Sequence, residues 1–133
     1  LSRRQRQMCI RDSPYDYREC VEVSKEELTS GARPELAVEP GDLSGVEAVI
    51  LCYPCWCGTM PMPVWTFLEG CDLAGKRILP MCTNEGSGMG RSEADIRRLC
   101  PEAVVEKGLS VKGSAVESAG PAIEAWLREH GII

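Results

Sequence analysis

The chain has few aromatic residues, a single histidine and no long apolar run. Of its 133 residues, 5% are aromatic and one is histidine. Its longest continuous apolar stretch, at 48–52, is far shorter than the roughly 20 residues that cross a bilayer. These absences disfavour a membrane partner and a histidine-rich metal site. With 44% hydrophobic and 26% charged residues, the composition predicts one soluble domain, which we expect in the cytoplasm.

Basic residues are scarce outside the first 13 positions. The chain carries 15 Lys and Arg against 20 Asp and Glu, a net charge of −5, and its only dense basic cluster is Arg3, Arg4, Arg6 and Arg11. Nucleic-acid binding needs clustered basic side chains to neutralise phosphates, so the sequence disfavours a nucleic-acid partner. An acidic protein is instead suited to docking on basic partner proteins.

The segment that holds this basic cluster, residues 1–13, differs from the rest of the chain. It lacks apolar periodicity, and residues 8–13 resemble a translated adapter sequence from library preparation. An Arg-rich mitochondrial transit peptide is the alternative, but the amphipathic spacing is missing. We therefore expect residues 1–13 to be non-native and residues 14–133 to form the domain. Without the segment's four Arg and one Asp, 11 basic and 19 acidic residues remain, a net charge of −8.

The chain has eight cysteines, and no signal peptide for secretion is visible in the sequence. We therefore expect reduced thiols rather than a disulfide framework. Cys52, Cys55 and Cys57 form a C-x-x-C-x-C cluster. A structural zinc site needs four ligands and the other cysteines are scattered singly, so no metal site is expected. Cys52 and Cys55 have the spacing of a redox dithiol, but neither clearly lies at a helix N-terminus, where a thiolate is stabilised. Small buried or loop thiols are the favoured interpretation.

Short apolar runs alternate with amphipathic segments along the chain. The expected strands are 48–53, 77–82 and a weaker 104–109, and the expected helices are 16–30, 64–71, 92–100 and 121–130. Continuous short apolar runs are typical of strands buried on both faces of a parallel sheet. Pro80 is unusual in a central strand, and Ser92 is expected to cap its helix. This order predicts an α/β fold with a three-layer doubly wound parallel sheet.

Ligands of doubly wound sheets bind beyond the carboxyl ends of the strands. The chemistry is therefore expected in two loops, 54–62 and 83–90. The first loop is rich in Pro, Cys and Gly and contains Trp56, and the second is rich in Gly and polar residues.

The residues of these loops resemble one known family. Residues 51–69, Leu-Cys-Tyr-Pro-Cys-Trp-Cys-Gly-Thr-Met-Pro-Met-Pro-Val-Trp-Thr-Phe-Leu-Glu, look like the flavin loop and following helix of the bacterial flavodoxin family. Residues 75–88, Gly-Lys-Arg-Ile-Leu-Pro-Met-Cys-Thr-Asn-Glu-Gly-Ser-Gly, are similar to its next strand and second flavin loop. The resemblance keeps its order from Tyr15 to Leu127, which is more specific than one short motif.

The resemblance implies a flavodoxin-like fold with FMN held between the two loops. Trp56 would stack on the isoalloxazine ring. Gly58 would let the backbone approach the ring and change orientation as the flavin is reduced. In the second loop, Gly86 and Gly88 would leave backbone N–H groups free to meet the pyrimidine edge, and Thr83, Asn84 and Ser87 would add side-chain donors. No catalytic residue is expected. The implied cofactor-binding residues are Pro54, Cys55, Trp56, Cys57, Gly58, Thr83, Asn84, Glu85, Gly86, Ser87 and Gly88.

Three residues depart from the family pattern, in two places. Asn84-Glu85 stands where related loops commonly have His-Gly, and Cys57 replaces a frequent second Trp. A carboxylate at Glu85 would oppose negative charge on a reduced flavin.

The resemblance also implies that a part of the domain is missing. The family's phosphate loop, which follows its first strand, has no counterpart in the sequence. We therefore expect an N-terminally truncated domain that lacks the first two strands, leaves strand 48–53 as an edge and binds FMN weakly.

The implied function is a carrier that shuttles single electrons between redox partners with basic surfaces. Two alternatives stay open. One is an FMN-dependent NAD(P)H oxidoreductase of the same fold, and the other is a flavin-free dithiol protein that uses Cys52 and Cys55.

Overall fold

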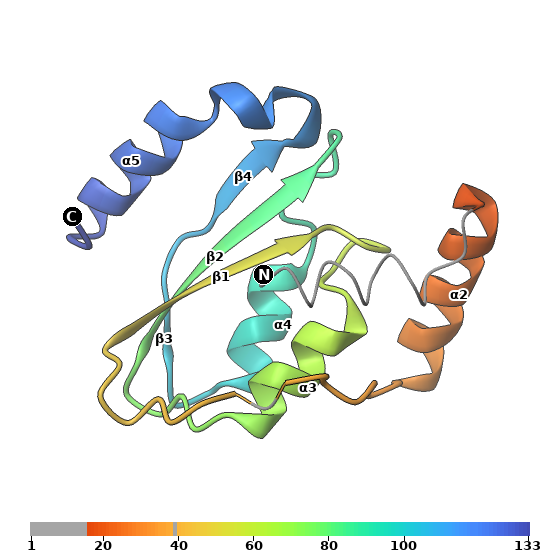
Figure 1. Ribbon diagram of the computed structural model, residues 1–133, viewed down its shortest axis with the longest axis horizontal. Coiled ribbons are helices and arrows are strands. Elements are labelled where there is room, and N and C mark those ends of the chain that lie inside the picture. The colour runs from red at the N-terminus through yellow and green to blue at the C-terminus, as the bar shows by residue number, and fades with distance from the viewer. Residues whose placement is uncertain (1–15, 39) are drawn as a thin grey trace.

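The computed structural model describes residues 16–38 and 40–133 (Figure 1). The expectation for residues 1–13 falls outside this range. No helix in the described ranges is long and apolar enough to cross a membrane. In chain order the elements are α2 (Tyr17–Ser30), β1 (Ala48–Pro54), α3 (Met62–Gly70), β2 (Arg77–Asn84), α4 (Ser92–Leu99), β3 (Val104–Val105), β4 (Leu109–Lys112), the 3-10 helix η1 (Gly113–Ser118) and α5 (Gly120–Glu129).

All described strands run parallel, and β2 lies in the middle of the sheet (Figure 1). The whole of β1 pairs with β2, from Ala48 opposite Arg77 to Pro54 opposite Thr83. β3 and β4 both pair with β2, β3 near its start and β4 near its end. Helices α3 and α4 form the crossovers that parallel neighbours require. The predicted α/β fold with a parallel sheet is confirmed.

The third strand differs from the prediction of a continuous strand at 104–109. It is divided into β3 and β4, and residues 106–108 belong to neither. The Glu106 N–H donates to the Ile78 carbonyl at 2.9 Å. The N–H and C=O groups of the even-numbered residues of β2 therefore face the third strand. Pro80 therefore turns its missing N–H toward the third strand, where no ladder bond can form. The pairing resumes at Met81 opposite Leu109.

Two backbone groups within the break in the third strand are bound by side chains of helices. Gly108 N–H donates to Glu93 Oε1 at 2.8 Å, and Trp126 Nε1 donates to the Lys107 carbonyl at 2.9 Å. Glu93 belongs to α4 and Trp126 to α5. The break is thus also the place where both helices are hydrogen-bonded to the sheet.

The core lies on both faces of the sheet. The larger apolar cluster joins β1 and β2 to α3 and α4, and includes Tyr53, Ile78 and Ile96. Leu79 points to the opposite face of β2, because side chains alternate along a strand, and it is also fully buried. Trp126 of α5 is 6% exposed. Helices on both faces give the predicted three layers, and β1 lies at one edge of the described sheet.

The helix ends agree with the sequence for α2 and differ from it for α4. Asp16 caps α2, since its Oδ1 accepts two backbone N–H groups at 2.9 and 3.1 Å, and Gly31 ends the helix at φ 65°. Ser92 is not the cap that was expected. Its hydroxyl is buried, donates to the Met89 carbonyl at 2.6 Å and accepts from Tyr53 Oη at 2.7 Å. A tertiary partner has taken the place of the local one.

Two isoleucines on neighbouring strands test the assignment of the core. Ile78 is 0% exposed and Ile50 is 43% exposed. Ile78→Ala should lower the free energy of unfolding by about 2–5 kcal/mol, because it opens a cavity. Ile50→Ala should cost about 1 kcal/mol or less. Urea unfolding followed by circular dichroism measures both, and equal losses would contradict the packing described above.

Candidate functional site

The first loop closes in a tight turn directly after β1. Trp56 and Thr59 exchange backbone hydrogen bonds of 2.8 and 3.0 Å. The two residues between them, Cys57 and Gly58, have φ of 51° and 77°. Positive φ at both central positions is the signature of a type I′ turn. Among the described residues Cys57 is the one non-glycine with positive φ, a conformation that costs a side chain about 1–2 kcal/mol.

This turn is held from the start of α4. The Arg91 N–H donates to the Gly58 carbonyl at 2.9 Å. Thr59 Oγ1 donates to Asp95 Oδ2 at 2.6 Å, and both residues are buried. Asp95 also pairs with Arg91 at 3.3 Å and with Arg98 at 3.4 Å. A change of orientation at Gly58, as the resemblance implies, would have to break its bond to Arg91.

Gly90 permits the two loops to touch. A Cβ on Gly90 would collide with the carbonyl oxygen of Gly58 and lie 2.8 Å from its carbonyl carbon. The φ of Gly90 is +54°, which also favours glycine. The close approach of the second loop to the Cys57–Gly58 turn therefore needs glycine at this position.

Asn84 organises the second loop from within. Its Oδ1 accepts the N–H groups of Gly86 and Gly88, each at 3.0 Å, and its Nδ2 donates to Ser110 Oγ at 2.8 Å. The expectation that these two glycine N–H groups are free for a ligand is therefore wrong, because both are used by the loop itself. Glycine still serves the loop, since Gly86 and Gly88 have φ of 125° and 65°.

Glu85 extends from the second loop to η1. Its Oε1 accepts the Ser114 N–H at 2.5 Å, and a Cβ on Gly113 would lie 2.8 Å from the same oxygen. A free N–H at the first turn of a helix favours such an acidic partner. The carboxylate that departs from the family pattern thus ties the loop to the segment after β4.

A cavity of about 620 Å³ lies at the carboxyl ends of β1 and β2. Eight of the eleven residues predicted from the sequence line it: Pro54, Cys55, Trp56, Cys57, Thr83, Asn84, Glu85 and Ser87. The predicted glycines Gly58, Gly86 and Gly88 are adjacent to the lining and not part of it. The structure thus brings the two predicted loops together around one cavity.

Sequence reasoning missed the residues that α2 contributes to this cavity. The additional lining residues are Tyr17, Cys20, Val21, Ser24, Lys25 and, from η1, Gly113. The five from α2 follow the spacing i, i+3, i+4, i+7 and i+8, which places them on one face of a helix. The sequence shows this periodicity, and with it that the five residues share one face of the helix. It does not show which other part of the fold that helix face packs against.

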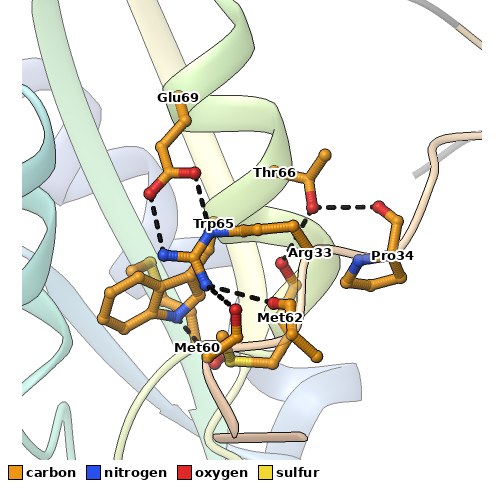
Figure 2. Close-up of polar contacts among 9 residues, drawn as sticks. Arg33, Pro34, Met60, Met62, Trp65, Thr66 and Glu69 are labelled. Atoms are coloured by element: carbon orange, nitrogen blue, oxygen red, sulfur yellow. Dashed lines mark hydrogen bonds and ion pairs between the residues drawn. The ribbon is translucent and has the colours of Figure 1, made fainter.

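The segment after α2 is fastened to α3 (Figure 2). The guanidinium of Arg33 binds both carboxylate oxygens of Glu69, at 2.7 and 2.8 Å. It lies 5.2 Å from the centre of the Trp65 ring, and Arg98 lies 5.3 Å from the same ring. Thr66 Oγ1 donates to the Pro34 carbonyl at 2.9 Å. The two-point contact with Arg33 also lowers the pKa of Glu69.

The cysteines of the first loop do not form the dithiol considered above. Cys52 lies on the exposed face of β1, whereas Cys55 packs against the core cluster on the other face. Loss of hydration raises the pKa of the Cys52 thiol, the opposite of an activated thiolate. The described residues also contain no group of three or more His, Cys, Asp or Glu side chains placed to hold a metal ion.

Comparison with known proteins gives the family. A family model described as Flavodoxin matches residues 7–130. The chain belongs to the flavodoxin family. Among curated proteins, no significant match to this flavodoxin-family chain was found.

Three solved structures resemble this flavodoxin-family chain. A candidate flavoprotein of Bacteroides uniformis is 26% identical with a TM-score of 0.70, over 82% of this chain and 70% of that one. A candidate flavoprotein of Bacteroides eggerthii is 25% identical with a TM-score of 0.70, over 88% and 75%. A flavoprotein of Lactobacillus acidophilus, crystallised with FMN, is 14% identical with a TM-score of 0.60, over 80% and 71%. The last likeness concerns the flavodoxin-like fold alone.

A matched pair of glycines tests the contact between the two loops. Gly90→Ala should cost about 1–3 kcal/mol more than Gly75→Ala, because only the first adds a clash with backbone. Gly75 has φ +70° and no atom within 4 Å of its Cβ position, so its substitution reports backbone strain alone. Urea unfolding gives both values. Equal costs would mean that Gly90 does not approach Gly58 as described.

Proposed function

We propose that this chain binds FMN in the cavity at the carboxyl ends of β1 and β2 and acts as an electron carrier. The observation that carries the proposal is the cavity of about 620 Å³ with Trp56 in its wall, in a chain of the flavodoxin family. Cofactor sites are concave, of roughly 300–1,000 Å³, apolar with a few polar groups, and lie at this end of doubly wound sheets.

The residues in the lining suit the parts of a flavin. The half-buried indole of Trp56 offers a flat face for the ring. Thr83 and Ser87 supply hydroxyl groups for its polar edge. Lys25 is the basic side chain of the lining and suits a phosphate group. When bound, FMN supplies the capacity to take up and release single electrons, and the protein supplies binding and electrostatics.

The charge of the chain suits an electron carrier, and a structural relative suits FMN as its cofactor. The chain has a net charge of −5, which favours encounter with redox proteins of basic surface. A protein of the same fold, from Lactobacillus acidophilus, has been crystallised in complex with FMN. A carrier of this kind would work in the cytoplasm.

Replacement of Trp56 tests the binding part of the proposal. FMN added to the protein with its cysteine thiols reduced should show the absorption and fluorescence changes of a bound flavin. Trp56→Ala should weaken the affinity about 2- to 10-fold, because one stacking contact is lost. Trp126→Phe is the control, since Trp126 lies in α5 and outside the cavity lining. Absence of FMN binding to the wild-type protein, or equal affinities for all three, would contradict the proposal.

The source of electrons separates a carrier from an oxidoreductase. With FMN loaded, we expect reduction by NADPH only when an NADPH-dependent reductase is added, followed by transfer to cytochrome c. The measurement is NADPH oxidation at 340 nm with and without the reductase, at matched flavin concentration. Steady oxidation without the reductase would support the NAD(P)H-dependent alternative instead.

A further inference from the structure

Helix α2 forms one side of the cavity but is joined only loosely to the rest of the fold. Five of its residues line the cavity, and none of its residues is buried. Its side-chain hydrogen bonds to described residues stay within the helix, as from Ser24 Oγ to the Cys20 carbonyl at 2.7 Å. In Figure 1, α2 stands apart from the sheet, on the side toward which β1 points. A helix with so few tertiary contacts can open locally at low cost.

The contacts that hold α2 are concentrated at its C-terminal end. Two residues after the Gly31 cap, Arg33 Nη1 donates to the Gly31 and Ala32 carbonyls at 2.9 and 3.1 Å. The same guanidinium binds both carboxylate oxygens of Glu69 in α3 (Figure 2). Leu28, in the last turn of α2, packs against the core cluster. Arg33 therefore clasps the C-terminal end of α2 to α3, and the described residues provide no such fastening at its N-terminal end.

The N-terminal end of α2 carries an aromatic ring at the rim of the cavity. Tyr17 lines the cavity and is 81% exposed. Trp56 lines the same cavity from the first loop and is half-buried. Aromatic rings gain free energy when they stack on another flat ring. A flat ligand that rests on Trp56 would therefore offer Tyr17 a surface on which to pack.

We propose that α2 is a lid on the cavity, which turns about the Arg33 clasp and closes its N-terminal end over a flat aromatic ligand. The open state admits the ligand, and in the closed state Tyr17 covers the side of the ligand that faces away from Trp56. Closure excludes water from the cavity and slows the escape of the ligand. The class of ligand rests on the proposed function, with FMN as the probe, whereas the opening of α2 is a property of the chain without ligand.

Hydrogen exchange followed by mass spectrometry tests the lid in the chain without flavin. The amides of α2 should exchange at least about 10-fold faster than those of α4, where Ile96 is 0% exposed. Arg33→Ala should speed exchange in α2 about 3- to 10-fold, because the clasp is lost while α4 keeps its buried face. Arg128→Ala is the matched control, since Arg128 also pairs with a glutamate, Glu124 at 2.6 Å, but within α5. Equal exchange in α2 and α4, or no effect of Arg33→Ala on α2, would overturn the proposal.

Dissociation of bound FMN gives a second readout, by stopped-flow fluorescence. Tyr17→Ala should raise the dissociation rate about 2- to 10-fold, because one stacking contact is lost. Arg33→Ala should also raise it, although Arg33 is not in the cavity lining, because it acts through the position of α2. Val23→Ala is the control and should leave the rate unchanged, since Val23 lies on α2 outside the lining.

The failure of the lid and the failure of the proposed function give different results. Bound FMN should slow exchange in residues 17–25. FMN that binds without slowing this exchange, or that leaves all four proteins at one rate, would overturn the lid and leave the proposed function standing. If the wild type binds no FMN, the proposed function fails, and the exchange rates of the ligand-free chain and its variants decide for or against the lid.

Discussion

The missing N–H of Pro80 is the constraint on which the arrangement of the layers depends. Proline in a central strand removes one ladder bond, and here the loss falls on the side of the third strand, which divides into β3 and β4. Within this interruption, the Lys107 carbonyl accepts from Trp126 of α5 and the Gly108 N–H donates to Glu93 of α4. Because backbone groups outside a ladder need other partners, the interruption is where side chains of both helices are hydrogen-bonded to the third strand.

The candidate site is built from loops that hold one another. The Gly58 carbonyl is bound by Arg91, and Thr59 is bound by the buried Asp95, so the first loop is fixed by α4. The second loop is closed on itself by Asn84, which also reaches Ser110 of β4. The wall of the cavity is therefore ordered before any ligand arrives, which reduces the entropy cost of binding.

Local features can be predicted from the sequence, but the distant residues with which they form hydrogen bonds cannot. The apolar run that became β1 and the capped helix α2 are evident from short-range patterns, and so are the two loops around Trp56 and Asn84. Pro80 is visible as an anomaly, but which neighbour loses its bond depends on the side that an N–H faces in the folded sheet. Ser92 is a good local cap, yet its hydroxyl serves Tyr53 across the fold. Local rules fail where a distant group competes for the same atom.

Two of the residues that depart from the family pattern, Cys57 and Glu85, are held in place by the site around them. Cys57 occupies a left-handed backbone position, φ 51°, that glycine or asparagine would adopt at lower cost. Strain of this kind persists only where the surrounding structure fixes it, and it gathers at ligand sites. Glu85 uses one carboxylate oxygen to bind Ser114 of η1. This bond holds the Glu85 carboxylate at the edge of the cavity. Glu85 therefore affects both the shape of the cavity wall and the electrostatic field in the cavity. Replacement of Glu85 changes both together.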